Sequence, residues 1–438
     1  MTKYLLLLLL PLITMGQEDF DQVLFEQYDR YKEKSIETRR FKHKDIQPLI
    51  ESLGKENGFS VTSLGVSIQG RSISMISVGT GETDVLLWSQ MHGDESTATM
   101  AMFDIFNYLK ENRGILHGLK VHFIPMLNPD GAELFQRRNA IGIDINRDAL
   151  RLQSPESRIL KAARDSLEAD FGFNLHDQSR YYNAEKTAKP ATLSFLAPAF
   201  NDEKDMSEKR GDAMKIIAMM NEVVQKHAKG QVGRYSDAFE PRAFGDNMQK
   251  WGTRTILIES GGHPEDREKQ FIRKLNYLSI LKAIKGISDQ SFETRSTKAY
   301  WDIPRNDRKL FDLKIENLNF PYLGATYNVD LGIIYDEIEN NNHSDFYLVG
   351  KIVDIGDLST HYGYETLSAE GFTFKTGETY PNILSNFEEF RELDIPQLLR
   401  DGSVSYTHLR AHETHEVISY AVFCLKLGGG GGGGGGGG

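Results

Sequence analysis

The feature that most constrains the fold is a regular alternation of short apolar runs and longer amphipathic stretches between residues 44 and 288. The apolar runs have the length of buried strands, which are predicted at 59–67, 71–79, 84–91, 120–127, 170–176 and 253–259. The amphipathic stretches predict helices at 44–55, 95–112, 154–168, 205–228 and 264–286. Apolar strands that alternate with such helices predict an α/β fold whose sheet is covered on both faces.

The start of the chain has the pattern of a targeting sequence. Residues 1–16 combine Lys3, a run of apolar residues and small side chains at the end, which predicts a secretory signal peptide cleaved after Gly16. The apolar run is too short for a transmembrane helix, so no membrane span is expected. We therefore expect a secreted or periplasmic bacterial protein.

The end of the chain is unlike the rest. Residues 404–438 resemble a translated sequencing adapter followed by a glycine homopolymer, so we expect this tail to be a library artefact and the natural chain to continue beyond about residue 402. The single cysteine, Cys424, lies in that tail. Neither disulfides nor thiol catalysis are therefore expected.

The remainder divides in two by character. After about residue 290 the sequence shows short β-type runs without helical periodicity, which predicts a smaller, truncated β-rich domain over 295–402 behind a catalytic-type domain over 17–290. The formal net charge is −11, which argues against nucleic acid as a partner because phosphates would be repelled.

Polar residues collect where the predicted strands end. They stand in MHGDE (91–95), in NPDGAELFQRRNAIGIDINRD (128–148), in FNLHDQ (173–178) and in ILIESGG (256–262). Loops that follow strands are where α/β sheets usually build their sites. These stretches are therefore the candidate functional site.

Three of these residues have the chemistry of a catalytic zinc site. His92 and Glu95 are three positions apart at the start of a predicted helix, so one turn can aim both at one point, and His176 is the best third ligand. Two histidines and one carboxylate leave a coordination position open for water. The alternative is that Glu95 only favours the helix N-terminus and His92 is a hydrogen-bonded residue at a strand end.

The motifs HGDE, NPDG, RRNAIGIDINRD, LHD and LIES, in this order over about residues 44–288, resemble the zinc carboxypeptidase family of secreted bacterial type. The resemblance implies an α/β/α sandwich around a mixed sheet of roughly eight strands and one Zn²⁺ ion. It also implies roles for individual residues. These are His92, Glu95 and His176 as metal ligands, Glu259 as general base, Arg137 as oxyanion stabiliser, Asn146 and Arg147 as the carboxylate clamp, Asp144 as the acid that orients a metal-binding histidine, and Arg71 at an outer subsite.

The implied function is hydrolysis of a peptide bond next to a free C-terminal carboxylate, by a zinc-bound water with Glu259 as general base. The expected partner is a peptide or peptide-like substrate, and the protein is expected to be a monomer. Two other functions stay open: hydrolysis of D- or γ-linked cell-wall peptides or of N-acyl amino acids by the same centre, and a catalytically inactive binding module. Arg138 could also take the place of Arg137.

The chain departs from the family pattern in the window before Glu259. Relatives carry a tyrosine on a mobile loop there, whereas this chain offers Phe239, Phe244 or, nearest, Tyr235. Asp246 falls in the same window, and a carboxylate at the side-chain pocket would favour basic residues. Arg147 is followed by an acid, Asp148, which could weaken binding of a carboxylate.

Overall fold

The computed structural model describes residues 19–374, together with the short paired strands β15 (Glu378–Thr379), β16 (Ser403–Val404), β17 (Tyr406–Thr407) and β18 (Tyr420–Ala421). The predicted signal peptide and nearly all of the predicted artefact tail lie outside the described residues. None of the described helices combines the length and the apolar character that crossing a membrane requires.

The main sheet has eight strands in the order β1-β2-β4-β3-β5-β9-β7-β8. Its bounds are β1 (Phe59–Val66), β2 (Ser72–Gly79), β3 (Thr83–Trp88), β4 (Leu119–Ile124), β5 (Phe171–Asp177), β7 (Leu193–Leu196), β8 (Val232–Arg234) and β9 (Arg254–Ser260). The four central strands β4, β3, β5 and β9 run parallel, while β1 and β2 pair antiparallel to their neighbours. β7 is antiparallel to β9 and parallel to β8. The predicted mixed sheet of about eight strands is confirmed.

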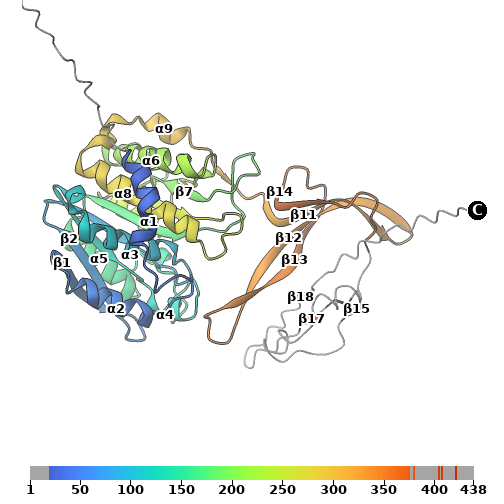
Figure 1. Ribbon diagram of the computed structural model, residues 1–438, viewed down its shortest axis with the longest axis horizontal. Helices are drawn as coiled ribbons and strands as arrows, with labels where there is room; N and C mark the ends of the chain where they lie inside the picture. The colour runs from blue at the N-terminus through green and yellow to red at the C-terminus, as the bar shows by residue number, and fades with distance from the viewer. Residues whose placement is uncertain (1–18, 375–377, 380–402, 405, 408–419, 422–438) are drawn as a thin grey trace, which may run out of the picture.

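Helices cover both faces of this sheet, as Figure 1 shows. One face packs against α1 (Phe20–Tyr31), α3 (Thr97–Glu111), α6 (Glu208–His227) and α8 (Gln270–Ser288). The other face packs against α5 (Pro155–Leu167) and α7 (Phe244–Lys250). The predicted α/β/α arrangement is therefore present.

Shorter elements connect these layers. They are α2 (His43–Leu53), α4 (Pro129–Glu133), α9 (Thr297–Trp301), the 3-10 turns η1 (Arg113–Leu116), η2 (Ile145–Arg147) and η3 (Ser291–Thr294), and the pair β6 (Asn183–Ala184) and β10 (Asn306–Asp307).

Several element boundaries differ from the sequence prediction, and two of the differences follow from a left-handed backbone residue. The strand predicted at 84–91 ends at Trp88, because Gln90 adopts a left-handed φ of 46° and turns the chain out of the sheet. The helix predicted at 264–286 begins only at Gln270, after Lys269 with a φ of 53°. The carboxylate of Asp266 then accepts hydrogen bonds from the first helical amides, at 2.6 Å from the nitrogen of Gln270. Such a cap satisfies donors that the helix itself leaves unpaired.

A second, smaller sheet lies beside the main body (Figure 1). It contains β11 (Leu310–Tyr322), β12 (Ala325–Glu339), β13 (Phe346–Gly356) and β14 (Tyr362–Ser368) in the order β13-β12-β11-β14. We call these four strands the small sheet. No helix occurs between residues 310 and 374, which agrees with the β-type runs seen in the sequence.

The hairpin of β12 and β13 reaches back to the main body and packs on a loop that precedes Arg137. The guanidinium of Arg40 is sandwiched there, 4.1 Å from the ring centroid of Phe135 and 4.2 Å from that of Phe346. Glu337 on β12 accepts hydrogen bonds from Arg39 at 2.7 Å and from Arg40 at 2.8 Å. Buried cations need such partners, so these contacts fix the small sheet against this loop.

Candidate active site

The predicted site residues, except Arg71, meet at the carboxyl edge of the central strands. His176 lies on β5 directly opposite Glu259 on the neighbouring strand β9. The loop that follows β3 on the other side of β5 carries His92 and Glu95. Because parallel strands end at the same edge, sequence positions more than 160 residues apart are brought together.

His92, Glu95 and His176 converge as a potential metal site. Nδ1 of His92 lies 2.8 Å from one carboxylate oxygen of Glu95, and Nδ1 of His176 lies 2.6 Å from the other. All three residues are buried, and their candidate ligand atoms lie within 4.8 Å of one another. Among residues 19–374, no other group of three such side chains meets that condition.

The donor set fits zinc. Two imidazole nitrogens and one carboxylate are borderline and hard ligands that zinc accepts, and three protein ligands leave room for water. Both oxygens of Glu95 face histidine nitrogens, so the alternative in which Glu95 only favours the start of α3 does not describe its contacts. Nε2 of His92 lies 3.1 Å from Asp144, an arrangement that fixes the ring and leaves Nδ1 for a ligand.

Asp144 and Glu259 have opposite electrostatic surroundings. Burial opposes ionisation of Asp144, but the hydrogen bond from His92 and the charge of Arg137 outweigh it and hold the pKa of Asp144 below its ordinary value. Burial raises the pKa of Glu259 well above its ordinary value, and the negative charge of Glu95 adds to that rise. Glu259 is thus a buried carboxyl group close to the candidate metal ligands.

Arg137, and not Arg138, points at this group. Arg137 donates from Nε to Asp144 at 3.0 Å, and its Nη1 lies 3.6 Å from a carboxylate oxygen of Glu95. Arg138 instead donates to the carbonyl oxygen of Gly142 on the exposed side of the loop. Of the two arginines, Arg137 therefore lies at the candidate site and Arg138 does not.

A pocket of about 450 Å³ opens over these residues. Asn146 and Arg147 line it, where Asn146 accepts a hydrogen bond from the amide of Phe244 at 2.9 Å and Arg147 pairs with Glu240 at 3.5 Å. Asp148 does not line it, because its carboxylate accepts hydrogen bonds from the amides of Gln153 and Ser154. Asp148 therefore does not compete with a bound carboxylate.

Arg71 is not brought into this pocket. Its Nη1 donates to Asp130 at 2.7 Å, and Arg71 is absent from the pocket lining. An outer-subsite role for Arg71 stays a prediction that this arrangement does not support.

The three residues that could take the place of the relatives' tyrosine lie in different surroundings. Tyr235 lines the pocket, whereas Phe244, the first residue of α7, is buried in the core and Phe239 is outside the lining. Burial raises the pKa of Tyr235, and the charge of Glu259 adds to the effect, so its phenol stays neutral. Tyr182 also lines the pocket, with its ring 6.1 Å from that of Tyr235.

Sequence reasoning missed several lining residues. They are Asn174, Gln178, Ser179, Tyr182, Leu196, Pro198 and Glu240. Only Asn174 carried a signal, since it is a polar residue within the otherwise apolar run FGFNL. Gln178 is the last residue of the candidate stretch FNLHDQ (173–178) and Ser179 directly follows it, so their place could have been inferred from chain continuity.

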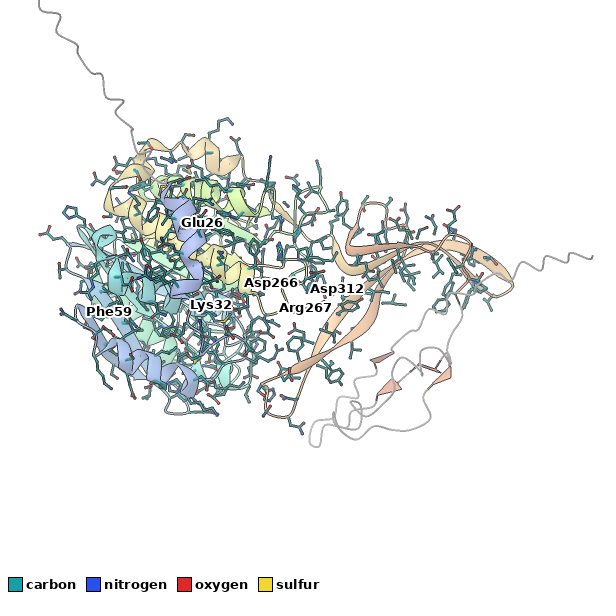
Figure 2. The ribbon with its side chains drawn as sticks, in the orientation of Figure 1. Glu26, Lys32, Phe59, Asp266, Arg267 and Asp312 are labelled. Atoms are coloured by element: carbon teal, nitrogen blue, oxygen red, sulfur yellow. The ribbon has the colours of Figure 1, made fainter. Side chains whose placement is uncertain are left out.

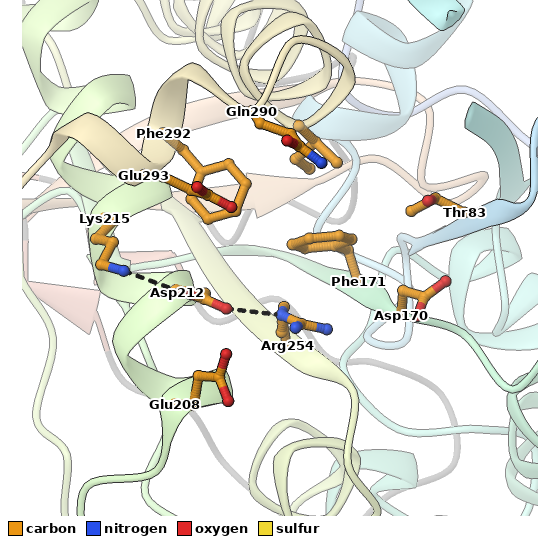
Figure 3. Close-up of a pocket in the computed structure, with 11 residues that line it drawn as sticks. Thr83, Asp170, Phe171, Glu208, Asp212, Lys215, Arg254, Gln290, Phe292 and Glu293 are labelled. Carbon is orange, nitrogen blue, oxygen red and sulfur yellow. Dashed lines mark hydrogen bonds and ion pairs between the residues drawn. The ribbon is translucent and has the colours of Figure 1, made fainter. Parts of the chain in front are cut away.

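Another cavity, of about 540 Å³, lies at the opposite edge of the sheet (Figure 3). It is lined by Thr83, Phe171 and Arg254, which begin β3, β5 and β9. Asp212 sits between Lys215 and Arg254 there, at 3.2 and 3.0 Å. Amino-terminal edges of parallel sheets rarely host chemistry, and this cavity holds no metal-ligating group among the described residues.

Comparison with known proteins agrees with the geometry. A family model described as zinc carboxypeptidase matches residues 50–227, which include the three candidate ligands and Arg137. Residues 50–227 belong to the zinc carboxypeptidase family. Glu259 lies outside residues 50–227, so the family match does not include it. The pairing of β5 with β9 places it next to His176.

Curated relatives are distant and longer than the matched part. Carboxypeptidase SOL1 of Arabidopsis thaliana is 26% identical over 182 residues, covering 34% of this chain and 35% of that protein. An uncharacterised protein of Zymomonas mobilis is 28% identical over 137 residues, covering 29% of this chain and 36% of that protein. The chain thus matches about a third of the length of each. A metallo-carboxypeptidase from Pseudomonas aeruginosa in complex with (2-guanidinoethylmercapto)succinic acid aligns with a TM-score of 0.46 at 17% identity, covering 57% of this chain and 70% of that one.

Proposed function

We propose that this carboxypeptidase-family chain hydrolyses the peptide bond next to a free C-terminal carboxylate. The observation that carries the proposal is the convergence in one pocket of a His–Glu–His group, a buried glutamate and an Asn–Arg pair. The apolar start of the sequence supports the further proposal that the enzyme is secreted or periplasmic.

The metal-binding residues would be His92, Glu95 and His176. A zinc ion in such a site supplies Lewis acidity, which polarises a carbonyl group and lowers the pKa of water. Glu259 would accept a proton from the attacking water and deliver it to the leaving amine. Its position opposite His176 puts that carboxylate at the same edge of the sheet as the ligands.

Arg137, Asn146 and Arg147 would bind the two anionic groups of the substrate. These are the oxyanion that develops on the scissile carbonyl and the terminal carboxylate. Arg137 would donate to the oxygen of the scissile carbonyl as negative charge develops on it, a kind of contact that acts mainly in the transition state. Arg147 would hold the terminal carboxylate through a planar, two-pronged contact, with the amide of Asn146 donating beside it. Asp144 would keep His92 and Arg137 oriented, since it hydrogen-bonds to both.

Asp246 supports a preference for basic C-terminal residues. It lines the same pocket, where its carboxylate accepts a hydrogen bond from the amide of Glu240 at 3.1 Å. Glu240 lines the pocket too, so two carboxylates face the space next to the Asn146–Arg147 pair. A lysine or arginine side chain would find complementary charge there.

The test compares peptides that differ only at the C-terminus. Zinc-loaded protein is incubated with a peptide pool in free-acid and in amidated form, and products are read by mass spectrometry. We expect single C-terminal residues to be lost from the free acids only, and Glu259→Gln to abolish the loss. Glu51→Gln, an exposed glutamate on α2, is the matched control.

Two outcomes would count against the proposal. Cleavage of amidated peptides at the same rate would show that the Asn146–Arg147 pair does not recognise a carboxylate. No cleavage of either pool by zinc-bound protein would reject an ordinary carboxypeptidase and lead to assays with D- or γ-linked peptides and N-acyl amino acids.

A further inference from the structure

A cleft lies where the small sheet meets the main body, next to the active-site pocket. Its volume is about 250 Å³, and Gln178 and Ser179 belong to its wall and to the wall of the active-site pocket. The two spaces are therefore neighbours on either side of the segment that follows His176. Figure 2 shows Asp266, Arg267 and Asp312 at this junction.

The small sheet and the main body both contribute walls to the cleft. Tyr335, Asp336 and Glu337 come from β12 of the small sheet, while Arg39, Arg180, Tyr181, Gly261, Gly262, Asp266, Arg267 and Lys269 come from the main body. The small sheet is thus part of the surface that a ligand leaving the active-site pocket in this direction would meet.

A buried carboxylate holds these walls together. Asp312 on β11 accepts hydrogen bonds from the Tyr181 hydroxyl at 2.6 Å, from the Tyr335 amide at 2.6 Å and from Arg267 at 2.8 Å. Its side chain is only 2% exposed. Since fully satisfied buried networks are rigid, the cleft is preformed and does not have to be assembled on binding.

The cleft and the carboxylate clamp lie towards opposite faces of the main sheet. Asn146 follows Ile145, which is buried together with Phe244 of α7 on one face. Arg267 and Lys269 directly precede α8, which packs on the other face. A peptide anchored by its C-terminus at Asn146 would cross the sheet edge at the metal-ligating residues and leave towards the cleft.

Cationic side chains of the cleft are paired with carboxylates that line it or lie next to it. Arg39 pairs with Glu337 at 2.7 Å, and Lys269 pairs with Asp177 at 3.0 Å. The carboxylate of Asp336, by contrast, makes no hydrogen bond or ion pair with any other described side chain. The cleft therefore suits an uncharged peptide backbone, with one position that favours a cation.

We propose that the cleft between the small sheet and the main body binds the upstream part of an extended peptide, with a basic side chain or a free amino terminus directed at Asp336. The inference rests on the proposed function and makes the preferred substrate an oligopeptide, in contrast to a dipeptide or an N-acyl amino acid. Binding energy from the remote part of a substrate can be used at the reacting bond, so longer peptides gain in kcat/KM.

The first test varies peptide length at a constant C-terminal pair of residues. Acetylated dipeptide, tripeptide, tetrapeptide and hexapeptide are compared by kcat/KM with zinc-loaded protein. Two or more hydrogen bonds in the cleft predict a gain of about 10-fold from the dipeptide to the hexapeptide. Equal kcat/KM across the series would overturn the inference while leaving the proposed function intact.

The second test measures binding without turnover. Affinities of labelled dipeptide and hexapeptide are measured by fluorescence anisotropy on zinc-loaded Glu259→Gln protein. A hexapeptide that binds about 10-fold more tightly supports the cleft even if the native enzyme cleaves neither peptide, in which case only the proposed function fails. Equal affinities would overturn the inference.

The third test addresses Asp336. A hexapeptide with an upstream lysine should bind about threefold more tightly than one with an upstream alanine, as expected for a half-exposed ion pair. Asp336→Asn should remove this difference, whereas Glu370→Gln, an exposed glutamate of the same part of the chain outside the cleft, should retain it. Persistence of the lysine preference in Asp336→Asn would refute the assigned contact.

Discussion

Substrate preference should depend on pH through Asp246. Burial raises the pKa of Asp246 to about 6, the charge of Glu240 adds to the rise, and the charge of Arg147 opposes it. The carboxyl group is therefore mostly neutral below that pH and mostly charged above it. Preference for a C-terminal lysine over a C-terminal alanine should rise as the pH increases through this value.

The size of the effect follows from the titration. With a pKa of about 6, the charged fraction of Asp246 is about 0.1 at pH 5 and about 0.97 at pH 7.5, a change of about 10-fold. A hydrogen bond to a charged partner contributes about 1.5–3 kcal/mol, so the full preference at pH 7.5 should be about 10- to 150-fold. Glu240, whose pKa is lowered to about 2 by its hydrogen bond from Arg242 and by the charge of Arg147, stays charged over this range. It would supply the preference that remains at pH 5.

The assay is a competition between two free-acid peptides that differ only in the last residue, lysine or alanine. Because both peptides compete for the same enzyme at each pH, titration of Glu259 or of the metal ligands cancels in the ratio of kcat/KM values. Asp246→Asn should give a lower ratio with no pH dependence between pH 5 and pH 7.5. A ratio that is constant in the native enzyme, or a pH-dependent ratio that survives Asp246→Asn, would refute the reasoning.

Three further outcomes are expected. Arg137→Lys should lower kcat by about 100- to 1000-fold with little change in KM, whereas Arg138→Lys should leave both unchanged in steady-state assays; equal effects would contradict the assignment. Removing the metal with a chelator should lower the melting temperature, and zinc at 100 times its dissociation constant should restore about 2.7 kcal/mol of stability in native protein but not in His176→Ala, as thermal melts would show. Asp104→Asn should lower the free energy of unfolding by about 3–5 kcal/mol in urea titrations, because it breaks the fully buried ion pair with Arg273; a loss below about 1 kcal/mol would show that this pair is not needed.

Most of the main sheet was predictable because its central strands are long and apolar. The predicted strand 170–176 agrees within one residue with β5 (Phe171–Asp177), since a run buried on both faces needs no alternation to be recognised. β7 and β8 were missed, because strands of four and three residues are too short for any periodicity to emerge. α7 was missed for the same reason, at seven residues.

The site was predictable where one motif sits at the end of one strand. His176 and Glu259 each end an apolar strand, so their meeting follows from parallel pairing alone. The role of the small sheet was not predictable, because its contacts with the main body join residues about 300 positions apart, such as Arg40 and Glu337. Nothing in the local pattern of either residue indicates such a partner. The outer-subsite role of Arg71 stays a prediction, and its guanidinium donates to Asp130.

The sandwich of Arg40 between Phe135 and Phe346 has a consequence for the order of events during synthesis. Arg40 and Phe135 leave the ribosome about 200 residues or more before Phe346 does, and domains fold as they emerge. Until the hairpin arrives, Phe135, which holds a left-handed φ of 45° two residues before Arg137, lacks the ring that closes the stack. The nascent chain can therefore complete its main sheet early, but the loop that carries Arg137 gains this support only when β12 and β13 have been made. The support of the loop that carries Arg137 is therefore expected to be completed after the main sheet has formed.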